Sequence, residues 1–307
     1  MKLIKEEFQL KKKKDGSSYS VRKQLDRIEE YFKEIESNVS ERPKEEKNKK
    51  EIAFAISLKS KILSLNWDQV QANLSKTLRS IFRNTDQSFR IIIAGHEKPD
   101  IKEIEHSQVT WLSVDFPPPV PPGSAPEFTE DKKHKRRVIG AYLREIEFSG
   151  YFMPLDADDW IHYRFVEYIR SNPITDAFLL TKGIMINRGL KEAWIRQRFY
   201  RSCGSSALYY FSDKDFPITS KKEEAEKLLF GLSIMHHGQV PQNLKEFNKG
   251  FKKVDLPFVT YVLGHGDNTS VIKGAKSNLV TAKKYKAQGV ELKKWFYRYF
   301  KIKTKYK

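Results

Sequence analysis

The sequence predicts an α/β fold with a mixed, mostly parallel sheet flanked by helices. From residue 51 onward, near-continuous apolar runs of strand length alternate with segments of helical periodicity, which is the pattern of parallel strands buried on both faces. The 307 residues include 39% hydrophobic residues, enough for a large core. No apolar run approaches the roughly 20 residues of a membrane-spanning helix. We expect a helical extension and linker over 1–50, an α/β domain over 51–275 and a basic tail over 276–307.

The N-terminal part is predicted to be a charged helix over residues 17–40, followed by a solvated linker over 41–50. In the helix, apolar residues recur at steps of three and four, namely Val21, Leu25, Ile28, Tyr31, Phe32 and Ile35. We expect this part to be an appendage of the α/β domain.

The first half of the domain is predicted to be strand, helix, strand and strand. The strands are IAFAISL from Ile52, FRIIIAGHE from Phe89 and VTWLSVDF from Val109, and the helix starts at Asp68 as its N-cap. Six prolines between Pro117 and Pro126 predict an extended loop.

The second half continues the alternation. We expect a helix that opens at the basic cluster Lys132–Arg137, a strand in GYFMPLDADDW from Gly150, a helix over 162–170 and a strand over 177–180, with an extension toward residue 186 left open.

Three carboxylates follow the fourth strand: Asp156, Asp158 and Asp159. The carboxyl ends of parallel strands are where open α/β sheets bind ligands. Close carboxylates repel unless a cation joins them, and hard divalent ions prefer oxygen ligands. The pattern favours a metal site, while capping of a helix near Trp160 is the alternative.

These motifs, in this order over residues 52 to about 190, resemble the GT-A nucleotide-sugar glycosyltransferases, especially the bacterial family 2 enzymes. The resemblance implies a Rossmann-like GT-A fold in which Asp156 and Asp158 bind Mn²⁺ or Mg²⁺ and the donor diphosphate. It also implies that a basic residue of the preceding helix, Arg137, approaches the donor.

The nucleoside of the donor is expected at the ends of the first two strands. The resemblance implies contacts from Ser57 and Lys59 after the first strand, with plain solvent exposure as the alternative. The family usually has paired acids after its second strand, and here Glu97 or Asp100 would replace them.

The resemblance also assigns roles farther along the chain. Asp213 or Asp215 is expected to be the general base, with an ordinary turn as the alternative. The motif YVLGHGDNTS implies His265 as a third metal ligand, with His236 and His237 as rivals, and Asn268 and Ser270 as phosphate contacts. An imidazole ligand would favour Mn²⁺ over Mg²⁺.

The net charge of +18 is concentrated at the C-terminus, because residues 281–307 contain ten basic residues and one acidic residue. Leu292, Trp295, Phe296, Tyr299 and Phe300 lie on one side of a predicted amphipathic helix. Such a helix is typical of a membrane interface, and docking of the aromatics on the domain is the alternative. We expect a cytoplasmic protein at the inner face of the membrane, since Cys203 alone forms no intramolecular disulfide.

The predicted function is metal-dependent transfer of a sugar, typically from a UDP-sugar, to a glycan or lipid-linked glycan in polysaccharide biosynthesis. A sugar-nucleotide nucleotidyltransferase is one alternative, although SLKSKILSLNW lacks the glycines of a phosphate loop. A nucleic-acid-binding protein is another, and it leaves the acid triplet unexplained. We therefore expect no nucleic-acid partner.

Overall fold

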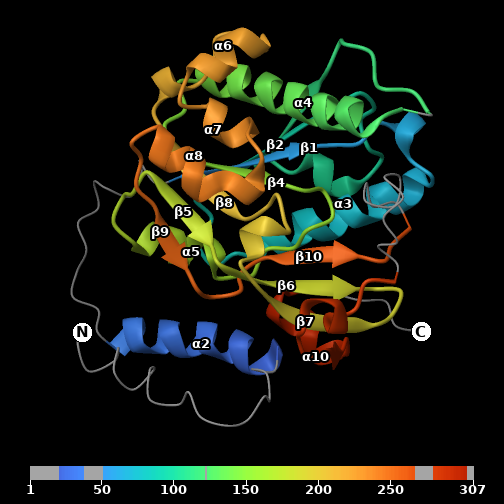
Figure 1. Ribbon diagram of the computed structural model, residues 1–307, viewed down its shortest axis with the longest axis vertical. Helices are drawn as coiled ribbons and strands as arrows, with labels where there is room; N and C mark the ends of the chain where they lie inside the picture. Colours follow the sequence, from blue (N-terminus) through green and yellow to red (C-terminus); the bar gives the residue numbers. More distant parts are fainter. Residues whose placement is uncertain (1–20, 38–50, 122, 267–278, 303–307) are drawn as a thin grey trace.

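The computed structural model describes residues 21–37, 51–121, 123–266 and 279–302, and it confirms a mixed α/β fold (Figure 1). A seven-stranded sheet has the order β3-β2-β1-β4-β8-β5-β9. Its strands are β1 (Ile52–Ser57), β2 (Phe89–Gly95), β3 (Val109–Ser113), β4 (Gly150–Leu155), β5 (Ala177–Leu180), β8 (Ala207–Phe211) and β9 (Lys252–Val254). The four strands β3, β2, β1 and β4 are parallel, and β8 runs antiparallel to β4 and β5.

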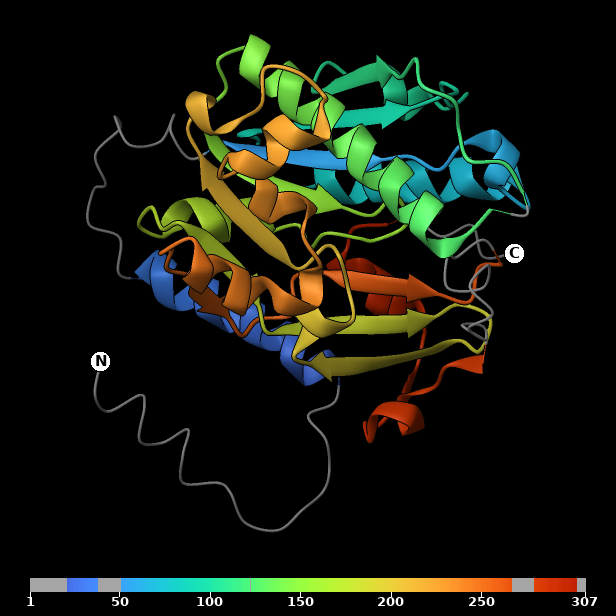
Figure 2. The ribbon, with the colours of Figure 1, turned by 45° about the horizontal axis from the view of Figure 1, so that its top comes forward.

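A four-stranded sheet lies beside the first, in the order β10-β6-β7-β11 (Figure 2). Its strands are β6 (Lys182–Asn187), β7 (Glu192–Gln197), β10 (Thr260–Leu263) and β11 (Val290–Glu291). The apolar stretch after residue 177 therefore forms two strands in two different sheets, and the single longer strand left open by the sequence does not form.

Helices cover both faces of the large sheet. The helices of the described residues are α2 (Val21–Ser37), α3 (Trp67–Phe82), α4 (Ala125–Glu145), α5 (Phe165–Ser171), α6 (Lys222–Lys227), α7 (Gly231–Ile234), α8 (Val240–Glu246) and α10 (Lys294–Tyr299). None of the helices in the described ranges has the length and apolarity needed to cross a membrane.

The side chains of β1 and β2 alternate between two cores. Ile52, Phe54 and Ile56 pack with α3 and α5. Ala53 and Ala55 pack with α4 on the other face. Small residues on the α4 face let this helix lie close to the sheet, so both faces of the central strands are dry.

The start of α4 differs from the prediction, because the helix begins at Ala125 and not at the basic cluster. Ser124 and Glu127 form a capping box, and Pro126 sits in the first turn, where its missing N–H costs nothing. The last proline of the proline-rich run therefore lies in the first turn of the helix. The N-cap of α3 is Asn66 instead of the predicted Asp68.

The N-terminal helix α2 is part of the main core and not an appendage. Val21, Leu25 and Ile28 are at most 1% exposed and belong to the cluster that includes α3 and α5. The guanidinium of Arg164 lies 3.9 Å from the centre of the Phe32 ring. The amphipathic pattern in the sequence is thus explained by packing on the domain.

The aromatic residues of the C-terminal segment pack on the domain, which was the alternative to a membrane interface. Phe296 and Phe300 are fully buried, and the rings of Trp160 and Phe300 are 6.2 Å apart. The helix α10 has six residues, too few for an interfacial helix with its own apolar face. In this arrangement the buried aromatic side cannot insert into a membrane.

Candidate active site

The carboxyl ends of three parallel strands meet at one edge of the large sheet. Ser57 at the end of β1 is in register with Ala94 of β2, and Ile56 is in register with Leu155 of β4. The chain leaves β4 directly into Asp156–Asp159, which we call the acid turn. This edge therefore gathers residues that are about 40 and 100 positions apart in the sequence.

Asp159 is the buried anchor of the acid turn. It has no exposed surface, and its Oδ2 accepts hydrogen bonds from Ser205 Oγ at 2.6 Å and Cys203 Sγ at 3.2 Å. Its Oδ1 accepts from the backbone N–H of Val262 at 3.2 Å. Burial, with the nearby charges of Asp158 and Asp156, raises the pKa of Asp159 well above its usual value. This carboxyl group joins the acid turn to the loop before β8 and to β10.

Asp158 lies at the surface of the turn and meets His265. Its Oδ2 is 2.7 Å from His265 Nε2, and the His265 side chain is only 4% exposed. His265 follows β10, which is held beside the turn because the backbone N–H of Thr260 donates to Trp160 O at 3.0 Å. The structure thus brings together two of the three predicted metal ligands from positions 107 residues apart.

The third predicted ligand, Asp156, is paired with a cation of the protein. Lys132 of α4 donates a short hydrogen bond to its Oδ1. Burial opposes ionisation of Asp156, but the charges of Lys132 and Arg136 outweigh it, so its pKa lies below its usual value. The backbone N–H of Asp156 donates to Ser205 Oγ at 2.9 Å.

The donor set fits a cation in part. Two ligands in adjacent octahedral positions at about 2.1 Å from an ion are about 3 Å apart, close to the Asp158–His265 separation of 2.7 Å. In the part of the chain that the structure describes, no three His, Cys, Asp or Glu side chains form a group that could hold a metal. Two protein ligands are nevertheless enough for an ion that also binds water and substrate phosphates.

The residues expected to contact the nucleoside also lie after β1 and β2. Ser57 Oγ donates to Lys132 O at 3.0 Å, and Glu97 accepts from the backbone N–H of Lys61 at 2.8 Å. Lys59 is half-buried, and Asp100 is exposed, with its backbone N–H donating to Gln71.

The remaining predicted residues are placed elsewhere. Arg137 donates from Nε to Ser220 O and from Nη2 to Glu130, on the side of α4 away from Lys132, and its buried Nη1 has no hydrogen-bond partner among the described residues. Asn268 and Ser270 lie outside the described residues.

Asp213 and Asp215 lie at the opposite edge of the sheet. The strand before them, β8, is antiparallel to β4, with Phe211 in register with Gly150 at the start of β4. Asp215 accepts hydrogen bonds from Ser212, and the backbone N–H of Asp213 donates to Ser149. Neither residue is in position to act as the expected general base at the acid turn. The direction of β8, which sequence patterns do not reveal, is the reason.

Sequence reasoning missed the cations of α4 that face Asp156. Lys132 and Arg136 are spaced i, i+4 and therefore share a helix face, whereas Arg137 is rotated away from it. Helical spacing within the basic cluster would have identified them.

A second missed group lies beside the ends of β1 and β2. Lys135 is fully buried and donates to Leu58 O at 2.9 Å and to Asp131 Oδ2 at 2.7 Å. Asp131 Oδ1 and His96 Nδ1 are buried and have no hydrogen-bond partner among the described residues. Buried polar atoms without partners are costly unless a ligand or water satisfies them. Helix α4 thus brings an acid to the ends of β1 and β2.

Of the two rival histidines, His237 is the one that interacts electrostatically with the acid turn. Its Nδ1 lies 2.6 Å from Tyr200 O, and its ring is near enough to Asp156 that a charge on it would lower the pKa of that carboxyl group. A carbonyl oxygen only accepts, so Nδ1 carries the proton and Nε2 keeps a free lone pair. Burial is the main reason that the pKa of His237 lies below its usual value.

No protein-family model and no curated protein matches the chain. Among solved structures, S. aureus TarS is similar over 69% of this chain and 37% of its own chain, with a TM-score of 0.39 and 10% identity. A Bacillus anthracis protein described as a glucose-1-phosphate thymidylyltransferase is similar over 76% of this chain and 96% of its own, with a TM-score of 0.35 and 11% identity. HddC from Yersinia pseudotuberculosis is similar over 81% of this chain and 97% of its own, with a TM-score of 0.33 and 11% identity. At these TM-scores the likeness carries no assignment, and the fold described above rests on the strand order and register of this chain.

Proposed function

We propose that the protein is a GT-A-like glycosyltransferase that binds a nucleoside-diphosphate sugar at the carboxyl edge of its large sheet. The observation that carries the proposal is the Asp158–His265 pair, which two distant segments bring to 2.7 Å directly after β4. A structural capping role for the acid turn accounts less well for a histidine held only 4% exposed against a carboxylate.

The chain's own residues have distinct roles in this proposal. Asp158 and His265 would hold Mn²⁺ or Mg²⁺, which when bound supplies positive charge to the leaving diphosphate. Lys132 and Arg136 keep Asp156 ionised and fixed. Asp159 holds the turn in place through Ser205 and Val262.

The acceptor hydroxyl needs a base, and we assign that role to His237 in place of Asp213 or Asp215. Nε2 of His237 takes the hydroxyl proton as the acceptor oxygen bonds to the anomeric carbon. The bond from that carbon to the diphosphate oxygen breaks, and its electron pair leaves with the diphosphate. The free lone pair on Nε2 supports this assignment, since Tyr200 O fixes the tautomer.

A nucleotide-binding screen with and without Mn²⁺ tests the donor site. We expect UDP to bind more tightly with Mn²⁺, and Asp158→Ala to remove about 1.4 kcal/mol or more of that affinity, a tenfold change. Asp213→Ala is the matched control, because it removes a carboxylate from the opposite edge. Binding that needs no metal and survives Asp158→Ala would refute the donor site. Release of pyrophosphate from a nucleoside triphosphate, without formation of a glycoside, would instead support the nucleotidyltransferase alternative.

The base is tested by His237→Asn. The asparagine amide can still donate to Tyr200 O but offers no base at the position of Nε2. We expect transfer to fall by about 10²- to 10⁴-fold with unchanged UDP affinity. Full transfer activity in this variant would exclude His237 as the base.

We propose that contact with an anionic membrane, where it occurs, depends on charge alone. Exposed basic residues near the C-terminus support this: Lys283, Lys284, Lys286, Lys293, Lys294, Arg298 and Lys301. Each contributes about 1 kcal/mol near an anionic surface, and salt screens the attraction. Liposome binding should disappear at high salt and in a Lys283→Glu/Lys284→Glu/Lys286→Glu variant; salt-resistant binding would contradict the proposal.

A further inference from the structure

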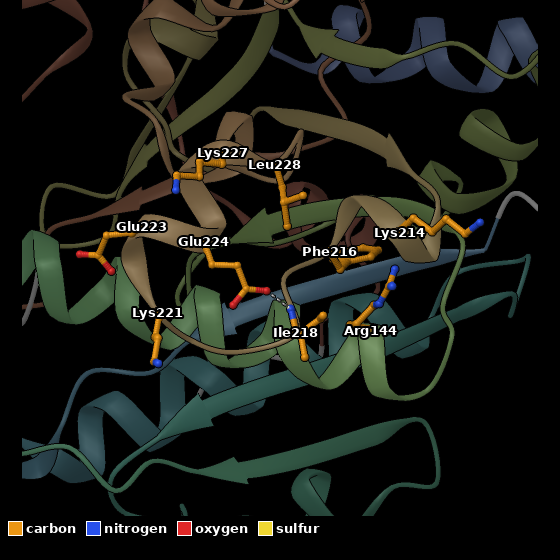
Figure 3. A pocket seen from close by; sticks show the side chains of 9 residues that line it. All are labelled: Arg144, Lys214, Phe216, Ile218, Lys221, Glu223, Glu224, Lys227 and Leu228. Atoms are coloured by element: carbon orange, nitrogen blue, oxygen red, sulfur yellow. Dashed lines mark hydrogen bonds between the residues drawn. The ribbon is translucent and has the colours of Figure 1, made fainter.

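A cavity of about 540 Å³ opens at the edge of the sheet opposite to the acid turn (Figure 3). It lies between the C-terminal end of α4 and residues 214–228. Helix α4 ends just before β4 begins, so its two ends lie at opposite edges of the sheet. Lys132, in its N-terminal half, contacts the acid turn, and Arg144, at its C-terminal end, lines the cavity. The cavity has the size of a site for a small organic ligand.

The cavity wall carries an excess of positive charge. Its basic residues are Arg144, Lys214, Lys221 and Lys227, and its acidic residues are Glu223 and Glu224. Glu224 is already engaged, because it accepts hydrogen bonds from the backbone N–H groups of Ile218 and Thr219 and from the Thr219 hydroxyl. None of the three lysines pairs with a carboxylate of the described residues. An anion is therefore the ligand that this charge distribution favours.

Arg144 is the anchor of the site. Its Nη1 is buried and has no hydrogen-bond partner among the described residues, and its ion pair with Asp213 is 3.6 Å long. Figure 3 shows its side chain extending toward the segment that carries Lys214 and Phe216. A guanidinium presents a planar pair of donors to a carboxylate or phosphate, and the Arg144 side chain is 30% exposed, so Arg144 can bind such an anion beside its long ion pair with Asp213.

The cavity also has an apolar part. The Phe216 side chain, 1% exposed, and the half-buried Leu228 belong to its wall, and Ile218 is 71% exposed at its border. A purely inorganic ion would leave Ile218 and Leu228 against water, whereas a ligand with an apolar body would cover them; Phe216 is already covered by the protein.

We propose that this cavity is a second ligand site, which binds a small organic anion with its acidic group on Arg144 and its apolar body against Ile218 and Leu228. The site is independent of the proposed donor site, because it lies at the other edge of the sheet.

The test uses phenyl phosphate as the probe, measured by titration calorimetry on the full-length protein. We expect one site with a Kd of about 1 mM or tighter. Inorganic phosphate lacks the ring and phenol lacks the charge, so each should bind about tenfold more weakly. UDP with Mn²⁺ should leave the affinity for phenyl phosphate unchanged. Displacement by UDP, or no binding of phenyl phosphate, would overturn the proposal.

Variants locate the site. Arg144→Gln should weaken phenyl phosphate about tenfold, and Lys221→Gln/Lys227→Gln should weaken it several-fold with a smaller salt dependence. The two lysines are exposed, so this second variant avoids any effect of Arg144 on folding. Arg83→Gln, an exposed arginine at the end of α3, is the matched control. Equal affinity in wild type and both cavity variants would overturn the proposal.

Discussion

The two edges of the large sheet hold their carboxylates in contrasting ways. At the carboxyl edge, Asp159 is completely buried and is bonded to two segments that lie 44 and more residues away. At the opposite edge, Asp215 is half-buried and is bonded to Ser212, three residues before it. A carboxylate held by distant segments fixes tertiary structure around a site, whereas one held by its own turn only closes that turn. This difference indicates that the acids of the carboxyl edge form a site, whereas those of the opposite edge close a turn.

The largest expected effect concerns the support behind the carboxyl edge. Phe300→Ala removes a fully buried ring that packs on Trp160, the residue that follows the acid turn. We expect the free energy of unfolding to fall by about 3–5 kcal/mol, measured by urea denaturation. Arg298→Ala, at an exposed position of α10, is the control. A loss below about 1 kcal/mol would show that the C-terminal segment does not stabilise this edge.

The next effect shows how far the polar groups of Asp159, as opposed to its side-chain volume, stabilise the protein. Asp159→Leu leaves the N–H of Val262 and the Ser205 hydroxyl without their acceptor, and we expect a loss of about 2–4 kcal/mol. Because the raised pKa favours the neutral carboxyl group, Asp159→Asn should cost clearly less. Thermal or chemical denaturation of both variants checks this, and equal losses would contradict the network.

A third, smaller effect depends on pH and involves His162, three residues after Asp159. Burial, helped by the charges of Arg164 and Lys301, lowers the pKa of His162 to about 3. The unfolded chain binds this proton near pH 6.5 and the folded chain does not, so the contribution is fully present above pH 6.5 and is lost as the pH falls toward 3.

The slope is about 1.4 kcal/mol per pH unit, which amounts to about 2 kcal/mol at pH 5. Denaturation of wild type and His162→Gln between pH 4 and pH 8 measures it. The variant should lack this part of the pH dependence, and parallel pH curves for the two proteins would contradict a neutral buried His162.

The smallest effect belongs to the opposite edge. Asp215→Ala removes the capping contact with Ser212, and we expect a loss of about 1 kcal/mol in stability with unchanged affinity for UDP in Mn²⁺. Calorimetry on the same preparation gives both values. A large loss of UDP affinity would mean that this edge takes part in donor binding after all.

Much of the fold could be predicted from the sequence, because buried parallel strands such as β1 and β2 are continuous apolar runs. The position of the acid turn followed from β4 in the same way. The direction of β8 could not be predicted, since it depends on which strand it pairs with, and this error misplaced Asp213 and Asp215.

The sequence also does not reveal what covers the apolar face of an amphipathic segment. The aromatic residues around Phe296 and Phe300 fit a membrane interface or a protein core equally well by composition, and only the tertiary contacts decide. The partners of Asp159, which include Ser205 and Val262, have no local signal either, because they act through a carboxylate far away in the sequence.

In the proposed donor site, Asp158 and His265 act on one bound cation. A double-mutant cycle on UDP affinity in Mn²⁺, with Asp158→Ala, His265→Ala and the double variant, tests it most directly. Each single variant should lose about tenfold or more in affinity, and the double variant should lose little beyond the larger single loss, because two residues that serve one ion are strongly coupled. Fully additive losses, or affinities equal to wild type, would contradict the claim.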